Sequence, residues 1–327
     1  MRITVGISTW NRAQLLEKTL EEMLKLRIPA GVTWELLIVN NNSDDCTDDV
    51  ISKYSNKLPL RRLFEPRQGK SNACNTLVNE ATGDLICWTD DDVLVDAEWL
   101  VAYCEAFAQW PKAAFFAGTI EPLYEIQPPV WVTENVHLLS GVLAIQSLDP
   151  LVRPLKDQEF PFGANMAIRI DAHRQRPFDS RLGPNGRQVT KGEETRLIEQ
   201  LRGDGHYGVW VGPAKVRHWV PANRMTHRYL WAWLLEDGVA QARRDQFPGT
   251  RLFGMPRWLI RQWLGHAVSL LRGWLTFDYF MRVKAWCKLA TIAGILCECR
   301  RQSKVMATTG SETGSPRARE TIDAGRQ

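Results

Sequence analysis

The stretch Asp84-Leu-Ile-Cys-Trp-Thr-Asp-Asp-Asp-Val93 joins a short apolar run to three consecutive aspartates. Asp84–Thr89 has the pattern of a strand, and the aspartates follow where that strand ends and the chain turns. Three adjacent carboxylates repel one another unless a cation lies among them, and hard oxygen ligands favour Mg²⁺ or Mn²⁺. The stretch therefore predicts a divalent metal site at a strand end, with a solvated turn as the alternative.

The sequence before this stretch alternates strand and helix patterns. Ile3–Thr9, Leu36–Val39 and Leu60–Phe64 have strand patterns, and apolar residues at helical spacing lie between the first two. A further helix is expected over residues 70–81, ending at Gly83. This βαβα order predicts an α/β fold with a mostly parallel central sheet flanked by helices.

Polar residues close three of the expected strands. Ligands of such sheets bind beyond the carboxyl ends of the strands, so we expect Thr9, Asn40 and Asp90–Asp92 to converge on one crevice. Each of these residues alone is also typical of a turn or a cap. Their position at three strand ends together favours a binding site.

Further elements are expected beyond the aspartates. Residues 119–160 are rich in proline and predict a long excursion over the sheet edge that shapes an acceptor site. A strand-like segment (162–168), a short helix near Ala172, a helix (193–202), two short strands (207–211 and 214–218) and two helical regions (226–246 and 256–300) follow. We expect a catalytic domain over residues 1–250, amphipathic helices over 251–302 and a disordered tail over 303–327.

Composition indicates an ordinary globular protein. The chain has 327 residues, 44% of them hydrophobic, which suffices for one large core without disulfides or a structural metal. Its seven cysteines are scattered, which is typical of a reduced, cytoplasmic protein. The N-terminus lacks a secretory signal pattern, and the best apolar run, Leu289–Cys297, is too short to span a membrane.

The C-terminal region is strongly basic. Residues 251–306 contain ten Lys or Arg residues and two acidic ones, while the whole chain carries a net charge of +4. Tryptophans and aliphatic residues recur at largely helical spacing over 258–275, interleaved with Arg257, Arg261 and Arg272. Because Trp and Arg suit the boundary between headgroups and acyl chains, we expect peripheral binding to the inner face of the cell membrane and no nucleic acid partner. The alternative is a helix that packs on the catalytic domain.

Six segments resemble, in order, the motifs of the family 2 glycosyltransferases, which have the GT-A fold. They are Ile7-Ser-Thr-Trp-Asn-Arg12, Ile38-Val-Asn-Asn-Asn-Ser-Asp-Asp45, Glu65-Pro-Arg-Gln-Gly-Lys-Ser-Asn-Ala-Cys-Asn75, Thr89-Asp-Asp-Asp-Val93, Phe162-Gly-Ala-Asn-Met-Ala167 and Gly192-Glu-Glu-Thr-Arg-Leu197. The matches cover about residues 3–220. The resemblance implies a transferase that uses a nucleotide-sugar donor.

The resemblance also implies roles for the matching residues. The nucleotide of the donor, a UDP-sugar being favoured, would contact Thr9, Asn11, Arg12, Asn40, Gly69, Lys70, Asp90 and Asp91. Asp90 and Asp92 would hold Mg²⁺ or Mn²⁺. The acceptor and sugar pocket would contain Gly163, Ala164, Asn165 and Glu193.

Three residues need separate comment. His218 follows a short strand; a lone histidine is commonly structural, but a histidine at this place completes the metal shell in some members of the family, and we count it among the expected metal ligands. Asn40 stands where the family usually has Asp, so a base hydrogen bond is retained and a charge is lost. Cys74 replaces a common Arg and removes a possible phosphate contact.

Glu193 and Glu194 open the helix expected over 193–202, where carboxylates also compensate the helix dipole. In the family this motif is usually Glu-Asp, and its second acid deprotonates the acceptor hydroxyl, so the resemblance assigns the general base to Glu194. One base opposite the leaving diphosphate supports a single in-line displacement with inversion.

These features together predict an inverting, metal-dependent transferase of hexosyl or related sugars, acting on a lipid-linked or saccharide acceptor in cell-surface polysaccharide or glycolipid synthesis. A nucleotidyltransferase is the first alternative, although a Gly-rich, basic loop after the first strand is missing. A sugar-nucleotide-binding scaffold without turnover is the second, against which the acids Asp90, Asp92 and Glu194 argue.

Overall fold

The computed structural model describes residues 1–185 and 189–312. The chain divides into two compact units, Met1–Trp233 and the part that begins at Leu234. The division falls inside helix α9 (His227–Arg244), whereas the sequence analysis placed the end of the catalytic domain at residue 250.

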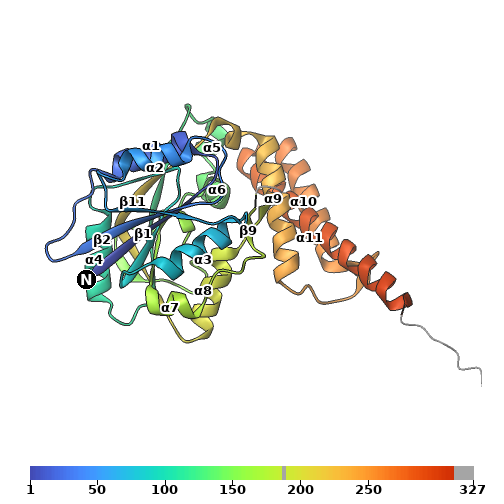
Figure 1. Cartoon of the computed structure of the whole chain (residues 1–327). Coiled ribbons are helices and arrows are strands. Elements are labelled where there is room, and N and C mark those ends of the chain that lie inside the picture. Colours follow the sequence, from blue (N-terminus) through green and yellow to red (C-terminus); the bar gives the residue numbers. More distant parts are fainter. Residues whose placement is uncertain (186–188, 313–327) are drawn as a thin grey trace, which may run out of the picture. The chain divides into compact units, whose positions relative to one another are not determined.

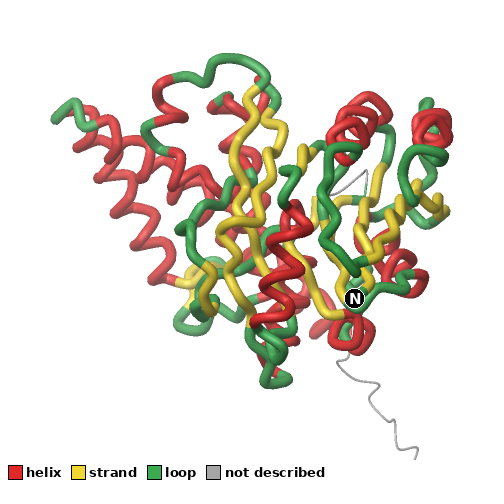
Figure 2. The backbone as a smooth tube through the Cα atoms, turned by 90° about the vertical axis from the view of Figure 1, so that its left-hand side faces the viewer, coloured by secondary structure: helices red, strands yellow, loops and turns green. Residues whose placement is uncertain are grey.

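The first unit is built on one large mixed sheet (Figure 2). Its order among the described residues is β3-β2-β1-β4-β8-β6-β11-β5, with β7 also paired to β11. The first four strands in this order are parallel, β6 is parallel to β11, and β8, β5 and β7 run antiparallel to their neighbours. The strands are β1 (Arg2–Thr9), β2 (Thr33–Asn40), β3 (Leu60–Phe64), β4 (Leu85–Trp88), β5 (Val93–Val95), β6 (Phe115–Tyr124), β7 (Val152–Pro154), β8 (Met166–Arg169) and β11 (Gly208–Val220).

Helices cover both faces of this sheet (Figure 1). One face carries α1 (Ala13–Met23), α2 (Thr47–Tyr54) and α4 (Trp99–Gln109), and the other carries α3 (Lys70–Glu80), α7 (Ile170–Gln175) and α8 (Glu193–Gly203). The predicted α/β sheet flanked by helices is confirmed.

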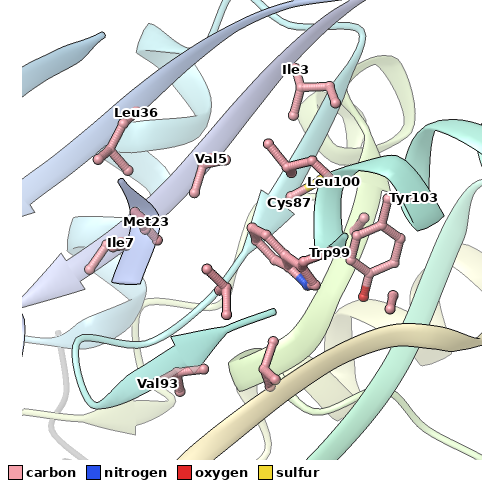
Figure 3. Close-up of a cluster of buried hydrophobic side chains, with 14 of the residues drawn as sticks. Ile3, Val5, Ile7, Met23, Leu36, Cys87, Val93, Trp99, Leu100 and Tyr103 are labelled. Carbon is pink, nitrogen blue, oxygen red and sulfur yellow. The ribbon is translucent and has the colours of Figure 1, made fainter. Parts of the chain in front are cut away.

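Successive side chains along each strand point to opposite faces of the sheet, so the core consists of two layers. Ile3, Val5 and Ile7 of β1 point to the α1 face, where they pack with Met23 and Trp99 (Figure 3). Along α1, buried side chains recur with the helical repeat that an amphipathic surface helix requires. Each fully buried Ile or Met stabilises the fold by about 1.5–3 kcal/mol relative to an exposed one.

The C-terminal part of the sheet differs in detail from the prediction. The two short strands expected over 207–211 and 214–218 form a single strand, β11, with an irregularity between Val211 and Lys215. Hydrogen bonds explain this continuity, because Thr119 Oγ1 donates to the Gly212 carbonyl (2.9 Å) and the chain therefore stays beside β6.

The expected excursion over 119–160 is a mixture of short elements. It begins with the end of β6, continues through α5 (Val130–Thr133) and α6 (Val136–Leu143), and ends after β7. The 3₁₀ turn η1 (Gly163–Asn165) then leads into β8. Strand β9 (Gly183–Pro184) pairs antiparallel with β10 (Val189–Thr190), and the turn η2 (Ala222–Met225) follows β11.

The second unit contains the end of α9, the hairpin of β12 (Arg251–Leu252) and β13 (Met255–Pro256), and helices α10 (Arg257–Leu275) and α11 (Tyr279–Glu312). Gly238 and Gly294 let α9 and α11 approach closely, since a Cβ at either position would lie 2.0 Å from a backbone carbonyl of the other helix. Helix α11 continues through the first part of the tail predicted over 303–327, and residues 313–327 lie outside the described residues. Within the described chain, no helix is long and apolar enough to cross a membrane.

Candidate active site

A cavity of about 630 Å³ lies at the carboxyl ends of β1 and β4. The side chains that the sequence analysis expected at strand ends line this cavity, with the exception of Asn40. The predicted residues that line it are Thr9, Asn11, Arg12, Gly69, Lys70, Asp90, Asp91, Asp92 and His218.

The turn after β1 shapes one side of the cavity. Asn11 adopts a positive φ of 53°, which asparagine tolerates better than most residues. Its backbone N–H donates to Ser43 Oγ (3.0 Å), and its Oδ1 accepts from the N–H of Asp44 (2.9 Å). The turn is thus tied to the loop after β2.

Arg12 connects two of the three aspartates. Its Nη1 atom donates to Asp91 Oδ1 and to Asp92 Oδ2, both at 2.9 Å. Burial raises the pKa of Asp91 to about 6 and the charge of Asp92 adds to this, against the opposing charge of Arg12. Burial lowers the pKa of the Arg12 guanidinium, but the charges of Asp91 and Asp92 raise it by more. Arg12 therefore remains a cation.

Lys70 connects the third aspartate to the predicted base. Its Nζ atom lies 2.8 Å from Asp90 Oδ1 and 3.4 Å from Glu194 Oε1. Burial opposes the charge of Lys70, but the two carboxylates raise its pKa well above the ordinary value. Gly69 precedes it at φ 131°, a left-handed backbone that allows the loop to turn directly into α3.

His218 faces Asp92 from β11. Its Nε2 atom lies 3.6 Å from Asp92 Oδ1, and its Nδ1 atom lies 3.1 Å from the Leu143 carbonyl. Because a carbonyl only accepts, Nδ1 carries the proton; burial, together with the charge of Arg224, lowers the pKa of the ring against the pull of Asp92. The Nε2 lone pair of the neutral ring therefore points toward a carboxylate oxygen, a pair that a cation would join.

The residues fit a divalent cation in part. Asp92 and His218 present hard oxygen and imidazole ligands, and Asp90 lines the same cavity. Among the residues that the structure describes, no three acidic, histidine or cysteine side chains converge closely enough to hold a metal by themselves. Oxygens of a ligand would be needed to complete such a shell.

Glu193 and Glu194 lie beside the cavity at the start of α8. A second, small pocket of about 10 Å³ joins them to Lys70, Asp90 and Gly163. Burial and the charge of Glu194 raise the pKa of Glu193 to about 8. A Cβ atom at Gly163 would lie only 2.3 Å from Glu194 Oε1, so the glycine leaves the space that this carboxylate occupies.

Three residues predicted for the site lie elsewhere. Asn40 donates to Asp48 Oδ1 (2.7 Å) and accepts from the N–H of Ser43 (2.8 Å), so its amide holds the loop instead of facing the cavity. This arrangement has a physical cause, because the Asn40 amide can donate to Asp48, whereas an aspartate at position 40 would repel it.

Asn165 and Ala164, predicted for the sugar pocket, are buried in the core and do not line the cavity. The Asn165 side chain accepts from Trp99 Nε1 (2.8 Å) and Tyr103 Oη (2.7 Å) and donates to two backbone carbonyls (2.8 and 2.9 Å). All of its hydrogen-bonding capacity is used in joining α4 to β6 and β11. Ala164 accepts from Thr89 Oγ1 through its carbonyl (3.2 Å).

The cavity also contains residues that the sequence analysis did not select. Trp10 is 40% exposed on its rim, although the side chain is large and apolar. Asn41 accepts from the N–H of Gly69 (2.9 Å) and thereby positions the loop before α3. Four of these residues adjoin predicted ones in the sequence: Ser8, Trp10, Asn41 and Gln68. Nothing in the sequence pattern singles out the remaining three, Ala144, Pro184 and Arg224.

Cys74, which replaces a common arginine of the motif, is buried beside the small pocket. Burial raises the pKa of its thiol to about 12, so it remains protonated and uncharged. Its Sγ atom lies 4.0 Å from Ser8 Oγ. The cation in this part of the site is therefore Lys70 and not residue 74.

The sequence of the chain is similar to those of known proteins. The model of "Glycosyl transferase family 2" matches residues 4–173. The succinoglycan biosynthesis protein ExoM of Rhizobium meliloti is 25% identical over 248 residues, which cover 74% of this chain and 75% of that protein. The poly-beta-1,6-N-acetyl-D-glucosamine synthase of Staphylococcus epidermidis is 25% identical over 45% of this chain, and the match spans 35% of the synthase.

Solved structures share the fold at low identity. S. aureus TarS 1-349 in complex with UDP-GlcNAc aligns over 93% of this chain and 92% of that chain, with a TM-score of 0.55 and 14% identity. The mannosyltransferase PcManGT from Pyrobaculum calidifontis, in complex with GDP-Man and Mn²⁺, aligns over 95% and 79% with a TM-score of 0.51 and 18% identity. These similarities identify the fold as that of the GT-A glycosyltransferases.

Proposed function

The chain belongs to glycosyl transferase family 2, and from that membership we propose that it transfers a sugar from a nucleotide-diphosphate sugar to an acceptor hydroxyl with inversion. One observation carries the proposal: the aspartate-lined cavity and the Glu194 carboxylate meet at Lys70 and Asp90. Transfer needs a site for the leaving diphosphate and a base within reach of the same sugar ring. Similarity to a succinoglycan biosynthesis protein supports a role in cell-surface polysaccharide or glycolipid synthesis.

Mg²⁺ or Mn²⁺ is the proposed cofactor, with Asp90, Asp92 and His218 as its ligands. The neutral His218 ring, whose Nε2 faces Asp92 Oδ1 at 3.6 Å, supports this assignment. When bound, the ion supplies positive charge to the diphosphate that leaves. The carboxylates and the imidazole then keep that charge at the strand ends, where the phosphates bind.

Glu194 is the proposed general base. Its partner Glu193 has a pKa raised to about 8 and therefore holds a proton at neutral pH. The acceptor hydroxyl gives its proton to Glu194, the acceptor oxygen bonds to the anomeric carbon, and the bond to the diphosphate oxygen breaks with its electron pair leaving on the diphosphate. One displacement inverts the anomeric centre.

The donor nucleotide is proposed to bind Thr9, Asn11, Arg12, Gly69, Lys70, Asp90 and Asp91. Trp10 presents an exposed aromatic face at the rim, and bases stack on such faces. A UDP-sugar carrying a hexose or related sugar is the preferred donor, supported by the UDP-GlcNAc complex of a protein with this fold. Gly163 and Glu193 are proposed to border the sugar.

We propose a lipid-linked or saccharide acceptor and an anionic membrane surface as partner of α10. Leu264, Val268, Leu271 and Leu275 repeat at intervals of four, three and four residues and are 54–73% exposed. The buried residues of α10, Leu259 and Gly273, lie on its opposite face. An apolar stripe with arginines beside it suits a helix that lies in the plane of a membrane, at the inner face of the cell membrane.

The experiment that tests the function measures products. The purified full chain is incubated with UDP-glucose, UDP-GlcNAc or GDP-mannose, with and without Mn²⁺, and with lipid-linked oligosaccharide acceptors. Mn²⁺-dependent release of a nucleoside diphosphate that increases with acceptor is expected. Nucleotide binding without any release would favour a scaffold. Release of a sugar 1-phosphate, with the nucleoside monophosphate transferred, would favour a nucleotidyltransferase.

A further inference from the structure

Three cationic side chains line the cavity among the described residues: Arg12, Lys70 and Arg224. Two of them are already engaged by carboxylates of the protein. Arg12 bonds to Asp91 and Asp92, and Lys70 bonds to Asp90 and Glu194. The third cation, Arg224, differs from these two in its pairing with carboxylates of the protein.

Arg224 has no carboxylate partner in the part of the chain that the structure describes, and its guanidinium makes no hydrogen bond there. The guanidinium group has five N–H donors in a planar fork that matches a phosphate or a carboxylate. A cation without an internal partner on a cavity wall is suited to an anionic ligand.

The backbone that carries Arg224 is held at several points. Its N–H donates to the Pro221 carbonyl (3.0 Å), and the N–H of Ala222 donates to Glu125 Oε2 (2.7 Å). The next residue, Met225, is 4% exposed and anchors the turn in the core. Thr226 Oγ1 then accepts from the N–H of Tyr229 (3.2 Å) at the start of α9. The turn that follows β11 thus fixes the backbone of Arg224 beside the cavity, and a ligand has only the side chain to order.

We propose that Arg224 is a further binding and catalytic residue that contacts the diphosphate of the donor and stabilises it as it leaves. This inference rests on the proposed function. The diphosphate gains a negative charge when the glycosidic bond breaks, so an arginine on it contributes more in the transition state than in the donor complex. Arg12 and Lys70 are already paired with the aspartates and Glu194. Among the cationic side chains of the described residues that line the cavity, Arg224 therefore keeps its donors for the phosphates.

The test compares UDP with UMP in titration calorimetry in the presence of Mn²⁺. Arg224→Ala is expected to weaken UDP binding about 10- to 100-fold and UMP binding much less, because a charge-assisted hydrogen bond to the second phosphate is lost. Arg224→Lys is expected to recover part of the loss, since it keeps the charge and not the fork. Arg228→Ala is the control, because Arg228 is exposed on α9 and does not line the cavity.

Kinetics provide the second measurement. With a transferable donor, Arg224→Ala should lower kcat by a larger factor than it raises the KM of the donor. Equal losses of UDP and UMP affinity, or an unchanged UDP affinity with a raised KM for the acceptor, would overturn the assignment. If the wild-type chain binds neither nucleotide in Mn²⁺, the proposed function fails and this inference fails with it; normal wild-type binding with an unaffected Arg224→Ala variant rejects the inference alone.

Discussion

The Nε2 atom of His218 lies 3.6 Å from Oδ1 of Asp92, with the lone pair of a neutral ring turned toward a carboxylate. Two acceptors at this separation repel each other weakly, and the Leu143 carbonyl prevents the ring from changing its tautomer. A dication between them would turn the repulsion into two attractive contacts. The effect of Mn²⁺ on ligand binding therefore tests the proposed role of Asp92.

Asp92→Asn should abolish the part of UDP binding that depends on Mn²⁺, because a neutral amide is a poor substitute for a carboxylate that faces a dication. Titration calorimetry with and without Mn²⁺ measures the difference. Asp171→Asn, on the exposed side of α7, is the matched control and should bind as the wild type does. An Asp92→Asn variant that retains the full Mn²⁺ effect would remove Asp92 from the proposed metal site.

Glu194→Gln should lower turnover about 10²–10⁴-fold with little change in the affinity for UDP and Mn²⁺, because positioned bases contribute this much to rate. The measurement is kcat at a saturating donor concentration. Glu193→Gln is expected to lose less, since Glu193 already holds a proton at neutral pH. Near-normal transfer by Glu194→Gln would show that the base lies elsewhere.

Gly163→Ala should lower kcat about 10- to 100-fold by displacing the base, since the new Cβ would lie 2.3 Å from Glu194 Oε1. The binding of UDP should persist because Gly163 does not line the larger cavity. Gly203→Ala, where a Cβ meets nothing within 4 Å, is the control for adding a methyl group. Equal activity of the two variants would mean that the position of Glu194 is not critical.

The contribution of Glu193 to the stability of the metal-free protein should decrease as pH rises from about 5 to about 8. In the folded chain the pKa of Glu193 is about 8, whereas its ordinary value is 4.5. Between these pH values the folded state keeps a proton that the unfolded state has lost, so raising the pH favours unfolding. Glu193→Gln removes this titration, and we expect its Tm at pH 8 to exceed that of the wild type by at least about 2 °C, the effect of roughly 1 kcal/mol.

Thermal unfolding of both proteins between pH 5 and 8.5 measures this effect. Below pH 5 the two unfolding temperatures should approach each other, because both the folded and the unfolded wild type then carry the proton. Curves of Tm against pH that run parallel for the two proteins would refute the prediction.

Val268→Glu should release the protein from anionic vesicles, since it places a charge in the exposed stripe of α10. Vesicle flotation measures the bound fraction, which we expect to fall at least tenfold. Gln262→Glu adds the same charge to an exposed position of α10 away from the stripe and should bind nearly as well as the wild type. Unchanged flotation of Val268→Glu would eliminate the stripe as a membrane surface. These substitutions are preferable to removing residues 251–327, because α11 packs against Gly238 of α9.

The sequence was sufficient for the fold class and for much of the site. Apolar runs identified β1 to β4, and parallel strands must present their carboxyl ends on one edge, so Thr9 and Asp90–Asp92 share a cavity. Lys70 was predicted from the family motif Glu65–Asn75, to which it belongs. In each case a local pattern determined the position, and sheet geometry supplied the neighbours.

Only the tertiary structure decided which of several similar side chains face the cavity. Asn40 and Asn41 are adjacent and chemically identical, yet Asp48 binds the first amide and the backbone of residues 65–69 binds the second. Asn165 belongs to a family motif, but its side-chain amide is buried in the core, where it accepts hydrogen bonds from Trp99 and Tyr103. These outcomes depend on hydrogen-bond partners far away in the chain.

Sequence periodicity by itself determined that α10 is a helix with apolar residues and that strands carry the acids to one edge, because both follow from repeats of a few residues. The tertiary structure alone decided that Leu264, Val268, Leu271 and Leu275 form an exposed apolar stripe on α10 and that Arg224 lines the same cavity as the aspartates. Exposure and long-range approach are properties of how distant segments pack, and no local pattern encodes which face of a helix or which turn will lie next to a residue more than a hundred positions away.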